Sequence, residues 1–266
     1  MQTSGCHARY HECMTQHLFI LTGASRGMGL AMAQQLLEPG HTLLCLSRHT
    51  SDALAAQAAS SGCVLIQWSQ DLAEGAAASA RLADWLATQA AKAYASATLI
   101  NNAGVIPRIG PVRDADAADL AHALRVGLEA PMQLTAAFLH ATAQWPAARK
   151  VLNISSGLGR RAMASQAAYC TAKAGLDHFT RCLALEEALK PGGAKVCALA
   201  PGVIDTDMQL QLRGADAAAF PDRASFVGLK ERGLLTSPDA AAAQVLAWLQ
   251  RADFGDNPVA DVRDAG

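Results

Sequence analysis

Thr22-Gly23-Ala24-Ser25-Arg26-Gly27-Met28-Gly29 decides the fold, because this stretch joins an apolar run at 17–22 to a helix-forming segment that begins near residue 28. Glycines at the carboxyl end of a strand let the backbone turn tightly and approach a pyrophosphate, whose charge the N-terminus of the following helix stabilises. An ordinary Gly-rich turn is the alternative. The strand before the loop and the helix after it favour a dinucleotide-binding loop. The residues expected to touch the cofactor here are Thr22, Gly23, Ser25, Arg26, Gly27, Met28 and Gly29.

Outward from this loop, short apolar runs alternate with longer Ala- and Leu-rich segments of helical period, which is typical of repeated βαβ units. The predicted strands are 17–22, 42–47, 63–68, 97–100, 150–155, 194–199 and a short one at 258–262. The predicted helices lie near 28–38, 52–60, 73–93, 115–143, 166–190 and 238–250. This order predicts an α/β fold: a single Rossmann-type, doubly wound parallel sheet with helices on both faces. One domain is expected over 17–266, with a long irregular stretch at 201–236 that is either functional or disordered.

Composition excludes several classes of partner. The 22 Lys and Arg nearly balance the 23 Asp and Glu, so the net charge of −1 provides no positive field for nucleic acid or an anionic membrane. No run approaches the roughly 20 apolar residues of a membrane-spanning helix. The seven cysteines, odd in number and without CxxC pairs, indicate reduced thiols in a cytoplasmic protein.

The first 16 residues are polar and lack the apolar core of a signal peptide, so we do not expect export. The cysteines and histidines of this segment allow two interpretations, a metal site or a flexible polar leader, and the leader is favoured. No metal is expected. The residues concerned are Cys6, His7, His11 and Cys13.

The end of the second predicted strand distinguishes NAD from NADP. An acidic residue there would bind the ribose 2′-hydroxyl, whereas this chain has Ser47-Arg48. Arg48, with Arg26 from the glycine loop, suits a 2′-phosphate, since Arg binds phosphate in a bidentate, charge-assisted way. Two solvated arginines are the alternative. We therefore expect NADP(H). Asp71, with Leu72 beside it, either binds the adenine amino group or caps the next helix.

Polar residues follow the later strands at the edge where such folds bind ligands. Asn102, Ala103 and Gly104 come after the fourth strand and Ser156 after the fifth. Tyr169 and Lys173 are one helical turn apart, so their side chains share a face. The ammonium beside the phenol is expected to lower the pKa of Tyr169 towards working pH and make it a proton donor and acceptor. Ser156 is placed to hydrogen-bond the substrate oxygen.

Together these motifs resemble the short-chain dehydrogenase/reductase family, whose TGxxxGxG, NNAG, Ser, YxxxK and PG elements all occur in order between residues 17 and 262. The resemblance implies that Ser156 polarises a carbonyl, that Tyr169 is the acid/base, and that Lys173 binds the nicotinamide ribose and lowers the Tyr pKa. It also implies a homodimer or homotetramer formed through the helices at 115–143 and 166–190. The segment that would hold the nicotinamide is Pro201, Gly202, Val203, Ile204 and Thr206.

One position departs from the family pattern. The family carries an Asn in a run like V-N-x-x-A-P, and here the run at 126–131 has Gly127 instead. Gly in a helix costs about 1 kcal/mol relative to Ala, so Gly127 needs a local reason. Either a second water keeps the proton relay working, or the chain is a weak enzyme. The second reading gives an alternative function: an NADP-binding regulatory or interaction protein.

The segments at 153–157, 200–209, 220–221 and 261–264 look like those of sepiapterin reductases and bacterial benzil reductases. That resemblance implies NADPH-dependent reduction of a ketone or 1,2-dicarbonyl, a small-molecule carbonyl being the expected partner. It implies that Asp261 anchors the substrate; local pairing is the alternative. Apolar side chains are expected to close over the substrate and exclude water, with loop packing as the alternative. They are Leu158, Met163, Met208, Leu210, Leu212, Phe220 and Phe226.

Overall fold

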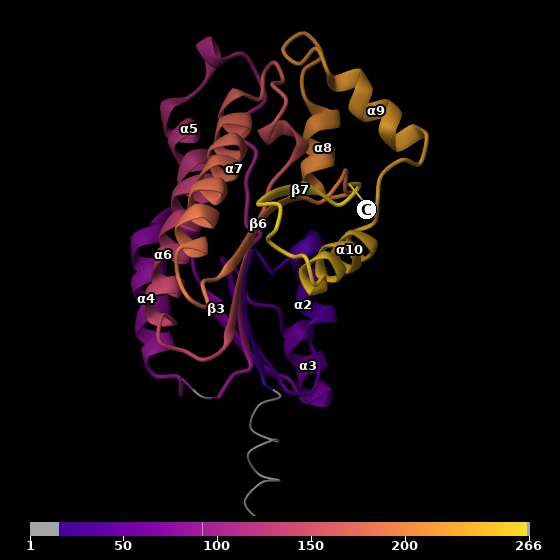
Figure 1. Cartoon of the computed structure of the whole chain (residues 1–266). Coiled ribbons are helices and arrows are strands. Elements are labelled where there is room, and N and C mark those ends of the chain that lie inside the picture. The colour runs from indigo at the N-terminus through magenta and orange to yellow at the C-terminus, as the bar shows by residue number, and fades with distance from the viewer. Residues whose placement is uncertain (1–15, 92, 265–266) are drawn as a thin grey trace, which may run out of the picture.

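Seven parallel strands in the order β3-β2-β1-β4-β5-β6-β7 form the centre of the computed structural model, which describes residues 16–91 and 93–264 (Figure 1). The strands are β1 (His17–Thr22), β2 (His41–Ser47), β3 (Val64–Ser69), β4 (Ser96–Asn101), β5 (Ala148–Ile154), β6 (Lys195–Ala200) and β7 (Val259–Asp261). Each pair of neighbours runs parallel. The predicted doubly wound, Rossmann-type sheet is therefore confirmed.

Helices cover both faces of this sheet, as Figure 1 shows: α4, α6 and α7 lie over one face, and α2, α3 and α10 over the other. Their bounds are α2 (Gly27–Gln35), α3 (Asp52–Ser61), α4 (Gly75–Ala87), α5 (Ala117–Leu124), α6 (Ala130–Ala141), α7 (Ala167–Ala188), α8 (Asp207–Gly214), α9 (Arg223–Glu231) and α10 (Pro238–Gln250). Two apolar layers fill the space between sheet and helices. Phe138 of α6 is fully buried in the first layer, and Met32 of α2 in the second. Buried strands with apolar side chains on both faces are what a parallel sheet requires.

The helix predicted over 115–143 is interrupted. A π-helical turn, Arg125–Glu129, separates α5 from α6, and Gly127 is buried within it. A Cβ atom on Gly127 would lie 3.2 Å from Cβ of Ala172 on α7, which is closer than ordinary contact. The local reason for this glycine is thus the close approach of two helices beside Lys173.

The prediction of an irregular stretch over 201–236 was wrong, because α8 and α9 occupy much of it. Both helices are short and pack on each other above the sheet (Figure 1). The helix predicted over 73–93 is also shorter: a 3-10 turn at Leu72–Glu74 leads into α4, which ends at Ala87. The polar leader, with its cysteines and histidines, lies outside the described residues except for Gln16.

No helix in the described part of the chain is long and apolar enough to cross a membrane. The order β3-β2-β1-β4 reverses direction at β1, so a crevice opens between the carboxyl ends of β1 and β4. The loops that follow β1, β2, β4, β5 and β6 all emerge at this edge.

Candidate active site

A cavity of about 960 Å³ lies at the carboxyl ends of the strands. Its walls include the glycine loop, the end of β2, the loop after β4, the start of α7 and the segment from the end of β6 into α8. All of the predicted site residues line it except Thr22, Leu210 and Phe220. Those that do are Gly23, Ser25, Arg26, Gly27, Met28, Gly29, Ser47, Arg48, Asp71, Leu72, Asn102, Ala103, Gly104, Ser156, Leu158, Met163, Tyr169, Lys173, Pro201, Gly202, Val203, Ile204, Thr206, Met208, Leu212, Phe226 and Asp261.

The glycine loop is packed so closely that positions 23 and 29 have no room for a side chain. A Cβ atom on Gly29 would lie 2.0 Å from the carbonyl oxygen of Gly23. Gly23 has φ +72°, and its Cβ would lie 2.9 Å from Cα of Ala103. The loop therefore presents bare backbone at the N-terminus of α2, which is the arrangement that accepts a phosphate.

Thr22 does not face the cavity, contrary to the prediction. It is 1% exposed, and its hydroxyl accepts the backbone N–H groups of Asn102 at 2.9 Å and Ala103 at 3.0 Å. Asn102 in turn donates from Nδ2 to the carbonyl of Thr22 at 3.0 Å. Thr22 thus fixes the loop after β4 against the glycine loop and acts on the site through its neighbours.

At the expected adenosine end, Arg48 is exposed, and its backbone carbonyl accepts a hydrogen bond from the Ser69 hydroxyl. The Ser47 hydroxyl accepts the N–H of Ala24 at 2.8 Å, so it holds the glycine loop. Asp71 accepts the N–H of Ala73 at 2.9 Å, which is the capping role that was left open.

Arg26 was expected beside Arg48, but its guanidinium forms an exposed ion pair of 3.2 Å with Asp207 at the start of α8. In the same region, a Cβ atom on Gly27 would lie 3.4 Å from Cγ2 of Thr206. The glycine loop and the segment before α8 therefore meet across the cavity.

That segment is fixed by backbone pairing with residue 236. Thr236 donates its N–H to the carbonyl of Val203, and Asp205 donates to the carbonyl of Thr236, both at 2.9 Å. Ile204 forms a parallel bridge with the same residue. The predicted nicotinamide segment is thus held against the sheet by the chain that leads into α10.

Ser156, Tyr169 and Lys173 meet at the other end of the cavity. A hydrogen bond joins the side chains of Ser156 and Tyr169. Lys173 Nζ lies 5.8 Å from the centre of the Tyr169 ring and donates to the carbonyl of Ile154 at 2.7 Å. The three groups needed to polarise and protonate a carbonyl oxygen are therefore together.

The expected lowering of the pKa of Tyr169 is not found. Burial raises the pKa of Tyr169 above its usual value, and the hydrogen bond with Ser156 opposes this only in part. Burial also lowers the pKa of Lys173 to about 8, against the charge of Asp177. Desolvation thus dominates both groups, and it keeps the phenol protonated at neutral pH.

Apolar side chains line the end of the cavity beyond Ser156, among them Leu158, Met163, Met208 and Leu212. Phe220 is an exception: it is fully buried behind the wall, where it stacks on Phe226 at 5.6 Å. The prediction that Phe220 contacts a substrate is therefore wrong, because its ring packs in the core of the α8–α9 region. Leu210 is 61% exposed and does not line the cavity.

Asp261 lines the cavity but is held by a neighbour. Its carboxylate accepts from Nε of Arg263 at 2.7 Å and from a terminal nitrogen of the same guanidinium at 2.5 Å. The Arg263 hydrogen bond, against the effect of burial, lowers the pKa of Asp261. The structure therefore shows local pairing of Asp261 with Arg263, which was the alternative to a substrate contact.

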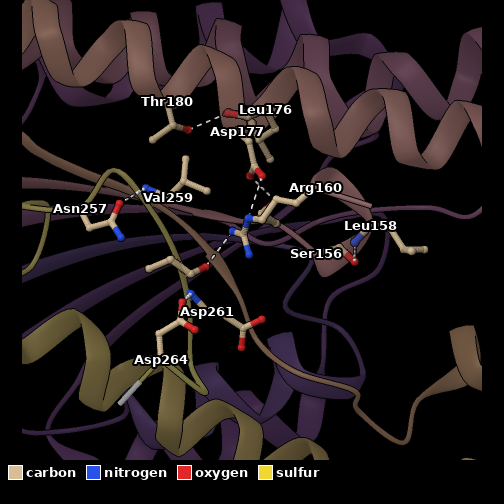
Figure 2. Close-up of polar contacts among 12 residues, drawn as sticks. Ser156, Leu158, Arg160, Leu176, Asp177, Thr180, Asn257, Val259, Asp261 and Asp264 are labelled. Carbon is tan, nitrogen blue, oxygen red and sulfur yellow. Dashed lines mark hydrogen bonds and ion pairs between the residues drawn. The ribbon is translucent and has the colours of Figure 1, made fainter. Parts of the chain in front are cut away.

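Sequence reasoning missed several residues of this region. His122 of α5 and Gln166 line the cavity, and both side-chain amide atoms of Gln166 are buried with no hydrogen-bond partner among the described residues. Arg160 forms an ion pair of 3.3 Å with the buried Asp177 (Figure 2). Asp177 had a detectable signal, because it lies one helical turn after Lys173. No local pattern marks Gln166 or Arg160.

Comparison with known proteins agrees with this geometry. A family model for short chain dehydrogenase matches residues 17–217. The chain is 36% identical over 242 residues to a benzil reductase ((S)-benzoin forming) of Bacillus cereus, covering 90% of this chain and 96% of that one. It is 34% identical over 247 residues to the sepiapterin reductase of Xenopus tropicalis, covering 88% and 91%. A short-chain dehydrogenase/reductase structure from Burkholderia vietnamiensis, 32% identical, matches with a TM-score of 0.62 over 94% of this chain and 100% of that one. The resemblance expected from the motifs is confirmed.

Proposed function

The chain belongs to the short-chain dehydrogenase family of oxidoreductases, and from that premise we propose that it is an NADPH-dependent reductase of ketones and 1,2-dicarbonyl compounds. The observation that carries the proposal is the convergence of Ser156, Tyr169 and Lys173 with the glycine loop in one cavity. The similarity to benzil and sepiapterin reductases over most of the chain supports a carbonyl substrate.

The residues of the cavity fit a nicotinamide dinucleotide. The contact between Gly29 and Gly23 leaves only backbone at the N-terminus of α2, where a pyrophosphate is stabilised. Arg48 stands where an NAD-binding chain carries a carboxylate, which supports NADP(H). The Pro201–Thr206 segment would hold the nicotinamide. When bound, the cofactor supplies the hydride.

This chain's own residues handle the charge that develops on the substrate oxygen. The Ser156 hydroxyl donates a hydrogen bond to that oxygen, and the Tyr169 phenol transfers its proton to it. The raised pKa of Tyr169 keeps this proton available at neutral pH. The Lys173 ammonium then stabilises the phenolate that remains. Ser156 acts from the loop directly after β5, and Tyr169 and Lys173 act from α7.

The substrate end favours an uncharged carbonyl compound. Leu158, Met163 and Leu212 line it and belong to one apolar cluster. Burial of such a surface suits an aromatic or aliphatic ketone, whereas a sugar phosphate or CoA ester calls for clustered cations. The Asp261 carboxylate is already paired with Arg263, so we do not assign it a substrate contact.

The test is the oxidation of NADPH, and separately NADH, followed at 340 nm with benzil, isatin, a simple diketone and sepiapterin. We expect turnover of a dicarbonyl with NADPH, and loss of turnover with retained NADPH binding in Tyr169→Phe. Tyr94→Phe is the matched control, since Tyr94 is buried outside the cavity and bonds Gln89. Most activity surviving in Tyr169→Phe would refute the assigned mechanism.

Gly127 supports a second candidate, a dinucleotide-binding protein without efficient chemistry. No side chain at this position faces Lys173, where the family carries an Asn. This candidate predicts tight NADPH binding with no oxidation across the same panel. Robust turnover of any carbonyl would refute it and show that Gly127 is tolerated.

We also propose that the chain assembles as a homodimer or homotetramer through α5, α6 and α7. Large apolar side chains are exposed on α6 and on and directly after α7: Met132 at 41%, Leu185 at 72% and Leu189 at 86%. A second copy would cover them. Light scattering after size exclusion tests this, and a monomer at micromolar concentration would contradict it.

A further inference from the structure

Helix α7 carries a polar stripe along the face that meets β5. Tyr169, Lys173, Asp177 and Thr180 lie three or four residues apart, so their side chains share this face. Except for Tyr169, each is buried: Lys173 is 4% exposed, Asp177 1% and Thr180 0%. Buried polar residues need partners, which must come from the strand.

The partners are consecutive residues at the end of β5. Asn153 donates to the Thr180 hydroxyl at 2.9 Å, and Lys173 donates to the carbonyl of Ile154 at 2.7 Å. The Ser155 hydroxyl donates to Asp177 Oδ1 in a short hydrogen bond. These contacts fix α7 in register with the strand directly before Ser156, and so set Ser156 against Tyr169.

Asp177 is also joined to the loop after Ser156. Figure 2 shows the Arg160 side chain reaching from that loop to Asp177, with Nε 3.3 Å from Oδ2. The same guanidinium donates to the carbonyl of Ala260 in β7 at 2.8 Å. Arg160 is 30% exposed in its side chain, whereas Asp177 is 2% exposed. The carboxylate thus ties together the β5 end, the following loop and the catalytic helix.

The charged and titratable groups around Asp177 come from three elements. On α7 itself they are Lys173 and Arg181, from the loop after β5 comes Arg160, and on β6 lies the Cys197 thiol. Burial raises the pKa of Asp177, and the Ser155 hydrogen bond and the three cations oppose that rise. Asp177 is the acidic group that acts on buried Lys173.

We propose that Asp177 is a positioning residue, whose carboxylate, held by Ser155 and Arg160, keeps the Lys173 ammonium charged and in place behind Tyr169. The proposal rests on the proposed function, because the charge of Lys173 matters through the Tyr169 proton transfer. None of the sequence motifs described above includes Asp177.

Loss of the Asp177 charge would affect catalysis through Lys173, which lies beside Tyr169. Burial alone disfavours a charged ammonium, and with Asp177 present the pKa of Lys173 is about 8. Gly127 supplies no polar side chain on the facing helix, so the polar partners of Lys173 come from β5 and from its own helix. Without the Asp177 charge, Lys173 will lose its proton at a lower pH and cease to stabilise the phenolate at neutral pH.

The experiment is Asp177→Asn, which preserves shape and an acceptor for Ser155 while removing the charge. Lysines labelled with ¹³C at Cε report the titration of Lys173 by NMR in the protein without substrate, with Lys173→Met for assignment. We expect the Lys173 midpoint to fall by about one pH unit. The alkaline limb of kcat with NADPH and a dicarbonyl should fall by a similar amount, while KM for NADPH changes less than threefold. The matched control, Glu186→Gln, removes an exposed charge from the same helix and should shift neither.

A Lys173 midpoint that is unchanged in folded Asp177→Asn would overturn the proposal. If Asp177→Asn does not fold, Ser155→Ala takes its place, because loss of the hydrogen bond that most favours the Asp177 carboxylate weakens its charge and should move Lys173 in the same direction by less. An unchanged Lys173 midpoint in that variant would also overturn the proposal. The NMR readout needs no turnover, so absence of carbonyl reduction in the unmodified protein would count against the proposed function alone.

Discussion

Charge reversal at Arg48 is the sharpest test of the cofactor end of the cavity. Arg48 follows β2, its side chain is exposed, and it lines the cavity beside Ser47. No ion pair to another described residue holds the Arg48 guanidinium, so its charge is available to a ligand. Arg48→Asp would place a carboxylate where NAD-binding proteins carry one.

The expected loss of NADPH affinity has two parts. A charge-assisted hydrogen bond contributes about 1.5–3 kcal/mol, and exposure of Arg48 places it at the lower end of that range. Repulsion between Asp and a phosphate of nearly two charges at about 6 Å in water adds about 1 kcal/mol. The sum of about 2.5 kcal/mol corresponds to a weakening of Kd by roughly 70-fold. NADH lacks the phosphate and should lose less than about threefold.

The assay is a fluorescence titration of each cofactor with the purified protein at about 0.05 M and 0.3 M salt. Salt screens exposed charges, so the NADPH difference between the two proteins should shrink at the higher concentration. Arg113→Asp is the matched control, because this arginine is 84% exposed in a turn that does not line the cavity. Equal losses for NADPH and NADH in Arg48→Asp would show that Arg48 does not contact the 2′-phosphate.

Three further substitutions probe the scaffold. Gly29→Ala places a Cβ atom 2.0 Å from the Gly23 carbonyl oxygen, so NADPH binding should weaken at least about 100-fold in folded protein, and unchanged affinity would contradict the loop geometry. Phe220→Ala should reduce the free energy of unfolding by about 3–5 kcal/mol in urea, since the ring is fully buried; a loss below about 1 kcal/mol would show that it is not core. At Glu187, burial favours the neutral acid, but hydrogen bonds from Lys190 and a backbone N–H outweigh it and lower the pKa. This contribution is present above the unfolded pKa of about 4.5 and is lost as pH falls, so Glu187→Gln should destabilise at pH 7 but little at pH 3, and equal losses at both would refute it.

The fold was predictable because its determinants are local. Apolar runs bounded by turns mark the strands, and the Gly23–Gly29 loop marks the first βα connection. Helix starts are also predictable from local residues: the Ser237 hydroxyl accepts the N–H of Ala240, and Pro238 begins α10. Each of these signals depends on residues within a few positions of one another.

The interruption of the helix at Gly127 could not be predicted from local residues. The glycine itself stood out, but the π-helical turn follows from the packing of Gly127 against Ala172, which is 45 residues away in sequence. The helices α8 and α9 were missed because they are only 8 and 9 residues long and have polar exposed faces. Helices of this length depend on tertiary contacts more than on propensity.

The geometry and the electrostatics of the site therefore differ in how far a sequence determines them. Spacing fixes the geometry of the catalytic pair, because one helical turn separates Tyr169 from Lys173. The electrostatics of the same pair depend on groups that no motif contains, because desolvation raises the pKa of Tyr169 and lowers that of Lys173. A raised Tyr pKa keeps the phenol protonated at neutral pH. The protonation state of this pair thus depends on how deeply α7 is buried against β5, which only the packed structure reveals.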